Sequence, residues 1–156
     1  MTFPIETGKK IIPLAKPFFD KEEEKAVISV LRSGWHTQGP QTQAFETEFS
    51  KLVGTKYAIA VSNCTCALHI ALLLSGVRDG DEVIVPSFTY IACVNVIRHV
   101  SAKPVFVEVN EKTFNIDTRD LEKKITKKTK AIIAVDQVGL PCDIDKINAI
   151  AKRHNI

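Results

Sequence analysis

The chain has 156 residues, which is long enough for one domain with a buried core. Hydrophobic residues (45%) and charged residues (25%) are close to the averages for soluble globular proteins, which excludes a disordered or fibrous chain. Lys and Arg number 21 against 18 for Asp and Glu, and the excess lies mainly between Lys123 and Lys130; no aromatic residue is interleaved there, so nucleic-acid binding is not indicated.

Two amphipathic helices are predicted ahead of the first strand. Asp20 is a typical N-cap for the first helix, which is acidic in its opening turn, apolar along one face and ended by Gly34. The second helix is predicted over residues 42–52, with Gly54 as its C-terminal signal. We assign residues 1–55 to an N-terminal helical arm.

Strands and helices alternate over the remaining residues, 56–156, which we assign to an α/β domain. The predicted strands are Tyr57 to Val61, Glu82 to Val85, Pro104 to Val109 and Ala131 to Val135. The predicted helices cover residues 65–74, 91–99, 121–125 and 144–154. Because these strands are apolar along their whole length, both of their faces are expected to be covered, which is typical of a mostly parallel sheet flanked by helices.

A short polar turn lies between the first predicted strand and the helix that follows it. Cys64, Thr65 and Cys66 open this helix, where free backbone N–H groups and the positive end of the helix dipole favour an anion such as phosphate. The hydroxyl of Thr65 can add a further donor. The alternative is an ordinary N-cap formed by Ser62, Asn63 or Thr65. The local sequence leaves both interpretations open.

Two further polar segments follow the second and fourth predicted strands. Ligands of open parallel sheets bind at the carboxyl ends of the strands, which is where these segments lie. Tyr90 follows the second strand and could cover a flat heteroaromatic ring, with packing in the core as the alternative. Asp136 and Gln137 follow the fourth strand, and either side chain could contact a ligand. Asp143 is predicted to cap the last helix.

Taken in order, several stretches of the chain resemble the DegT/DnrJ/EryC1/StrS family of sugar aminotransferases, which depend on pyridoxal phosphate (PLP). The resemblance extends from about Ile12 onward and rests on the order and spacing of the matching stretches. They are Ser33 to Trp35, Gly39-Pro40, Phe45-Glu46, Ser62 to Leu68, Gly80 to Pro86, Lys103 to Val107, and Gly139 with Asp143. The fold it implies is the N-terminal part of the α/β large domain of a fold-type I PLP-dependent transferase.

By this resemblance the cofactor is pyridoxal 5'-phosphate. The amides and hydroxyl of residues 64–66 would bind its phosphate, and Tyr90 would stack on its pyridine ring. Asp136 and Gln137 would lie near the edge of the cofactor. The chain departs from the usual family pattern at two of these positions, because the family usually has Gly in place of Cys64 and commonly His in place of Gln137.

The resemblance also implies a reaction and its substrates. An amino group would pass from an amino acid, usually glutamate, to a nucleotide-linked keto-sugar, in surface-polysaccharide or amino-sugar biosynthesis. Trp35, Thr37 and Gly39 would help to shape the sugar-nucleotide pocket, and their loop would lie at a homodimer interface.

Two family residues have no counterpart here: the Schiff-base lysine and the aspartate that pairs with the pyridine nitrogen. We therefore expect no catalytic residue in this chain and no transaminase activity from it alone. We also expect an exposed strand edge to associate with the missing C-terminal part or with a second copy. The alternative function is a non-catalytic or regulatory module of the same fold. A Rossmann-type dinucleotide domain is disfavoured because no GxGxxG follows the first predicted strand.

The cysteines and the apolar segments bear on metal binding and location. The four cysteines lack the paired CxxC spacing of a zinc site, so no metal is expected. No secretory signal peptide is recognisable, and the apolar segments are shorter than the roughly twenty residues that span a bilayer. The sequence therefore predicts a cytoplasmic protein.

Overall fold

The computed structural model describes residues 16–156. These residues fall into two compact units that divide after Ala60, and each unit is described by itself. The predicted boundary after residue 55 stays a prediction, and the first fifteen residues of the predicted arm lie outside the described residues.

The first unit contains two helices, α1 (Lys21–Ser33) and α2 (Pro40–Val53). Asp20 caps α1 as predicted, and the Asp20 amide in turn donates a hydrogen bond of 2.7 Å to the Glu23 carboxylate. Both helices end at a glycine in the left-handed conformation, Gly34 with φ 75° and Gly54 with φ 71°. No residue of α1 or α2 is buried, so their apolar faces are exposed within this unit.

The strand predicted from Tyr57 to Val61 does not form, and that prediction is wrong. A parallel strand needs a neighbour for its backbone groups, and no strand in the described part of the chain pairs with this segment. Instead, the amide of Ala60 donates a hydrogen bond of 2.8 Å to a carboxylate oxygen of Glu46. An apolar, β-branched run was therefore not sufficient to make a strand.

The second unit is built on a parallel sheet of three strands in the order β2-β1-β3, which confirms the predicted α/β class. The strands are β1 (Glu82–Pro86), β2 (Lys103–Val107) and β3 (Thr129–Ile132). All five residues of the central strand β1 are buried. Past β3 the ladder continues, since the amide of Ile133 donates to the Ile84 carbonyl at 2.8 Å.

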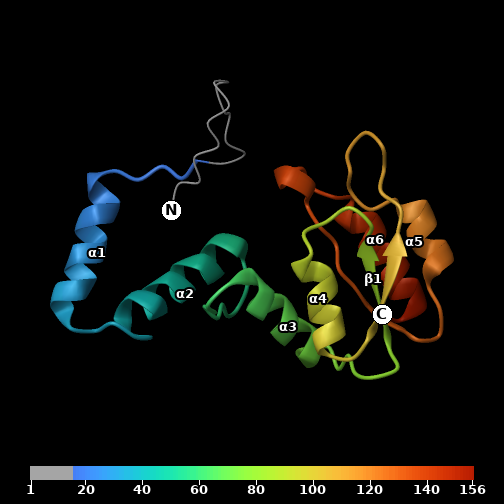
Figure 1. The fold of residues 1–156 in the computed structure, drawn as a ribbon, viewed down its shortest axis with the longest axis horizontal. Helices are drawn as coiled ribbons and strands as arrows, with labels where there is room; N and C mark the ends of the chain where they lie inside the picture. Colours follow the sequence, from blue (N-terminus) through green and yellow to red (C-terminus); the bar gives the residue numbers. More distant parts are fainter. Residues whose placement is uncertain (1–15) are drawn as a thin grey trace, which may run out of the picture. The chain divides into compact units, whose positions relative to one another are not determined.

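Helices cover both faces of this sheet (Figure 1). They are α3 (Cys64–Leu74) and α4 (Ala92–His99) on one face, and α5 (Thr118–Lys124) and α6 (Ile144–His154) on the other. On the first face Leu72 and Ile97 pack with Val85 of the sheet, and on the second Leu121 and Ile147 pack with Ile84. Alternate residues of β1 thus contribute to two separate cores, as expected for a strand covered on both sides.

Within residues 16–156, no helix combines the length and the apolar character that crossing a bilayer requires.

Candidate functional site

In the first turn of α3, two backbone amides have no partner among the described residues. Asn63 is the N-cap, and its side chain accepts a hydrogen bond of 2.9 Å from the amide of Cys66. The amide of Ala67 donates to the Asn63 carbonyl at 3.2 Å. No described residue accepts from the amides of Cys64 or Thr65, or bonds to the Thr65 hydroxyl. The N-cap formed by Asn63 therefore leaves donors in this turn that an anion could use, and phosphate binding there stays a prediction.

The side chain at position 64 is compatible with such binding. Cys64 is the first residue of α3, and it is not among the non-glycine residues with positive φ, which are Ser101, Phe114, Val138 and Asn155. The turn is therefore unstrained although the family usually has Gly here. Two free amides and a hydroxyl at a helix N-terminus are suitable donors for a dianionic phosphate, so the residues present fit the phosphate group of PLP.

Tyr90 lies in the connection from β1 to α4. Its side chain is 76% exposed, so the alternative that it packs in the core is wrong. Its carbonyl accepts a hydrogen bond of 3.0 Å from the amide of Cys93, which fixes the backbone and leaves the ring free. Phe88, by contrast, packs against Phe114 with ring centroids 5.6 Å apart. Because no hydrogen bond between described residues joins Tyr90 to the first turn of α3, their common site stays a prediction.

Asp136 and Gln137 begin the connection from β3 to α6, which contains the short 3-10 helix η1 (Gln137–Gly139). The Asp136 carboxylate accepts a hydrogen bond of 2.8 Å from the amide of Cys142. The amide and then the thiol of Cys142 hold the pKa of Asp136 below its usual value. No described residue bonds to the side-chain amide of Gln137. Asp136 is thus occupied in stabilising its own loop, whereas the side chain of Gln137 has no hydrogen-bond partner among the described residues; a ligand contact by either residue stays a prediction.

Asn115 also organises this loop, and no sequence pattern had pointed to it. It lies between β2 and α5 and is 6% exposed. Its side-chain oxygen accepts from the amide of Gln137 at 2.9 Å, and its side-chain nitrogen donates to the carbonyls of Leu140 at 2.9 Å and Pro141 at 3.2 Å. A buried asparagine within a loop has no periodic signal that could have revealed it.

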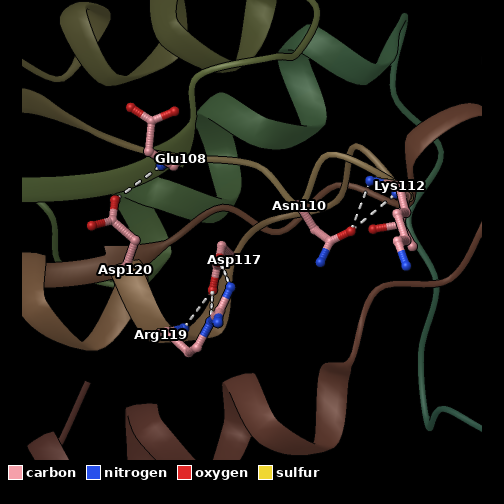
Figure 2. A network of polar contacts seen from close by, with 7 residues as sticks. Glu108, Asn110, Lys112, Asp117, Arg119 and Asp120 are labelled. Atoms are coloured by element: carbon pink, nitrogen blue, oxygen red, sulfur yellow. Dashed lines mark hydrogen bonds and ion pairs between the residues drawn. The ribbon is translucent and has the colours of Figure 1, made fainter.

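The connection that carries Asn115 is itself fixed by polar contacts (Figure 2). The side-chain oxygen of Asn110 accepts from the amide of Lys112 at 2.9 Å. Asp117 caps α5 and forms an ion pair of 2.9 Å with Arg119. The hydrogen bond from the Arg119 side chain is the main reason that the pKa of Asp117 is lowered to about 2. The backbone on both sides of Asn115 is therefore well defined.

The three residues predicted to bind substrate line one cavity of about 340 Å³ in the first unit. They are Trp35, Thr37 and Gly39. The indole nitrogen of Trp35 donates a hydrogen bond of 2.9 Å to the carbonyl of Gln38. A side chain at position 39 would overlap the indole ring, so Gly39 allows the ring to lie against the backbone. These residues are close in the sequence and lie around one cavity, but their role in binding a sugar nucleotide stays a prediction.

Comparison with known proteins identifies the family. Residues 17–156 match the model of the DegT/DnrJ/EryC1/StrS aminotransferase family. The chain belongs to this family. The match begins close to the predicted start at Ile12, a residue that lies outside the described part of the chain. The family and its solved structures indicate PLP as the cofactor.

Individual relatives agree with this assignment. The chain is 41% identical over 152 residues to the spore coat polysaccharide biosynthesis protein SpsC of Bacillus subtilis, covering 97% of the chain and 39% of SpsC. The protein Spr1654 of Streptococcus pneumoniae, solved in its PLP and PMP (pyridoxamine phosphate) forms, is 40% identical with a TM-score of 0.86; the match covers 91% of this chain and 36% of Spr1654. The chain thus spans about two fifths of the length of these relatives.

A third relative carries out a different type of reaction. It is GDP-4-keto-6-deoxy-D-mannose-3-dehydratase of E coli, solved with bound hydrated PLP. It is 33% identical to this chain with a TM-score of 0.85, and the match covers 92% of this chain and 39% of the dehydratase. Proteins with this fold therefore include dehydratases as well as aminotransferases.

Proposed function

We propose that this chain supplies the phosphate-binding and ring-covering part of a PLP-dependent sugar aminotransferase. The reaction is the transfer of an amino group from an amino acid, with glutamate as donor, to a nucleotide-linked keto-sugar. The observation that carries the proposal is the first turn of α3, where the Cys64 and Thr65 amides and the Thr65 hydroxyl have no described partner. Family membership and the names of the relatives support the choice of cofactor and substrate class.

The residues of this chain would act by binding and orienting. When bound, PLP supplies the electron sink that the amino-group transfer needs. The amides of Cys64 and Thr65 hold the phosphate, with the helix dipole adding to the attraction. Tyr90, whose ring is exposed, covers one face of the heterocycle, and stacking of this kind contributes about 0.5–1.5 kcal/mol. Gln137 offers an uncommitted amide that can both donate and accept at the ring edge.

The cavity of the first unit is the candidate binding site for the substrate. Trp35 presents an indole ring, and Thr37 adds a hydroxyl to the same cavity. An aromatic surface with a few polar groups is typical of small-molecule sites. We propose that this cavity contributes to the binding of the sugar nucleotide, and that the complete site forms in a homodimer.

Binding of PMP tests the cofactor assignment. PMP carries the phosphate and ring of the cofactor but no aldehyde, so it does not react with surface lysines. Equilibrium dialysis should show saturable binding that inorganic phosphate competes away, and Thr65→Val should weaken it by about tenfold through the lost hydroxyl. Thr118→Val is the matched control, since Thr118 also opens a helix and its hydroxyl has no described partner. Equal affinities for the two variants would remove Thr65 from the phosphate site.

A chimera tests the reaction. Residues 1–156 replace the matching part of B. subtilis SpsC, and the product is assayed with glutamate and a panel of nucleotide-linked keto-sugars. Formation of an amino sugar supports the proposal. Formation of a deoxy-keto-sugar without an added amino group would instead favour dehydration, the reaction for which the E coli relative is named. Tight PMP binding with neither product, while intact SpsC is active, would favour the non-catalytic binding module.

A further inference from the structure

A buried side chain fixes the loop that presents Gln137. Asn115 comes from the β2–α5 connection, and its contacts reach the start and the end of the loop between β3 and α6. It accepts from the amide of Gln137 at 2.9 Å and donates to the carbonyls of Leu140 at 2.9 Å and Pro141 at 3.2 Å. All three hydrogen bonds come from one residue that is 6% exposed. Because an amide offers an acceptor and two donors together, asparagine matches these three groups fully.

The loop that Asn115 holds contains a residue in an unfavourable conformation. Val138 has φ 53° and ψ 30°, and its side chain is 97% exposed. The left-handed region is disfavoured for β-branched residues, and packing does not compensate at this position. Such a conformation persists only when the surrounding contacts impose it. Contacts of three kinds shape this loop: the hydrogen bonds of Asn115, the bond from the Cys142 amide to Asp136, and two turn bonds, from the Gly139 amide to the Asp136 carbonyl and from the Leu140 amide to the Gln137 carbonyl.

We propose that Asn115 is a positioning residue: it holds the backbone of Gln137 at the carboxyl end of β3 so that the Gln137 side chain faces the cofactor. The inference rests on the proposed function, because it assumes that the loop borders a PLP site. Asn115 itself makes no contact with the ligand, since its side-chain hydrogen-bonding groups are all used within the protein. Its effect on binding passes through Gln137.

Asn115→Leu removes the three hydrogen bonds and keeps the branched shape of the side chain, and hydrogen exchange reports the effect on the loop. We expect the amides of Gln137 and Cys142 to exchange at least about tenfold faster in the variant, while the amides of β1 keep their protection. Protection of β1 shows that the variant is folded. Asn110→Ala is the matched control, since Asn110 lies in the same connection but its side chain accepts only from amides of its own turn. Unchanged exchange in the Asn115→Leu loop would overturn the proposal.

PMP affinity separates a positioning role from a merely structural one. We expect Asn115→Leu to weaken PMP binding by about fivefold to tenfold and Asn110→Ala to leave it unchanged. If Asn115 acts through Gln137, then Asn115→Leu should cause no further loss in a Gln137→Leu background. If the two substitutions weaken PMP binding additively in the double variant, the proposal that Asn115 acts through Gln137 would be overturned. Faster loop exchange with unchanged PMP affinity would also overturn it, and would leave the proposed function intact.

PMP binding by the unmodified chain distinguishes a failure of the proposed function from a failure of the positioning role of Asn115. If the unmodified chain binds no PMP while the exchange results are as expected, the proposed function fails together with the ligand-facing role of Gln137, and Asn115 only maintains the loop. Asn115→Asp gives a second variant if Asn115→Leu fails to fold. It keeps an acceptor for the Gln137 amide but places a carboxylate against two carbonyl oxygens, so its effect should be in the same direction.

Discussion

The hydroxyl of Thr126 donates a hydrogen bond of 2.6 Å to the carboxylate of Glu82, a residue 44 positions earlier in the chain. Glu82 is the first residue of β1 and is 8% exposed, and Thr126 lies just before β3. The second carboxylate oxygen accepts from the Lys103 ammonium group at 3.3 Å. The Thr126 hydroxyl is the main reason that the pKa of Glu82 is lowered. One carboxylate thus links the beginnings of all three strands.

Loss of the Thr126 hydroxyl should therefore destabilise the second unit. We expect Thr126→Val to lower the free energy of unfolding by about 1–3 kcal/mol, because it leaves a mostly buried carboxylate with fewer donors. Urea denaturation measures this. Thr118→Val makes the same chemical change where the hydroxyl has no described partner, and should have a much smaller effect. Equal losses for the two variants would show that the contact is unimportant for stability.

The ion pair of Asp117 with Arg119 predicts a pH-dependent contribution to stability (Figure 2). The folded-state pKa of Asp117 is about 2, below the ordinary value of 3.8, so its contribution is complete above about pH 5 and is lost as the pH falls towards 2. Asp117→Asn keeps an N-cap oxygen but removes the charge. We expect this variant to be less stable at pH 7 by under about 1 kcal/mol, the usual value of an exposed pair.

Urea denaturation of both proteins across this pH range checks the sign. The difference between wild type and Asp117→Asn should be constant from pH 7 to about 5 and should shrink towards pH 2. A difference that stays the same down to pH 2 would mean that the Asp117 carboxylate titrates alike in the folded and unfolded chain.

Substitutions at Asn63 can distinguish its role as the N-cap of α3 from the proposed anion binding in the same turn. Asn63→Asp keeps the cap on the Cys66 amide, so stability should change by less than about 0.5 kcal/mol. The new negative charge beside the phosphate should weaken PMP binding by at least about tenfold. Asn63→Ala should instead lose about 1 kcal/mol of stability and bind PMP nearly normally, since it frees the Cys66 amide as a further donor. Similar affinity losses in both variants would contradict this assignment.

The outer edge of β3 is predicted to associate with another chain. Within the described residues β3 has a strand neighbour on one side only, whereas the opposite edge of the sheet, formed by β2, already carries Lys103 and Pro104. Lysine and proline discourage edge pairing, so self-association should occur through β3. Sedimentation velocity should show concentration-dependent association that Ala131→Lys reduces and Phe106→Lys does not. A monomer at all concentrations would contradict this prediction.

Features that depend on nearby residues could be predicted from the sequence. Asp20 and Asp143 act as N-caps, as their positions ahead of helical segments indicated. Asn63 is also an N-cap, but the sequence left it as one of three candidates with Ser62 and Thr65. The parallel sheet followed from the fully apolar strands. These features are encoded within a few residues of the position concerned, because a cap bonds to amides two or three residues further along the chain.

Features that depend on distant partners could not be predicted. The segment from Tyr57 to Val61 has the composition of a strand, but pairing requires a neighbour that composition does not specify. Asn115 bonds to Gln137, 22 residues away. The sequence also could not rank Asp136 against Gln137, since the contact that occupies the Asp136 carboxylate comes from Cys142 across the loop.

The hydrogen bonds of Asn115 to a later segment of the chain have a consequence for the order of folding. The loop after β3 is shaped by a residue that is synthesised before it and that belongs to the preceding crossover. Until that crossover has docked against the sheet, the loop around Val138 lacks the hydrogen bonds of Asn115 that help to hold the left-handed conformation of Val138. Gln137 would therefore reach its final place among the last events of folding, after the sheet has formed.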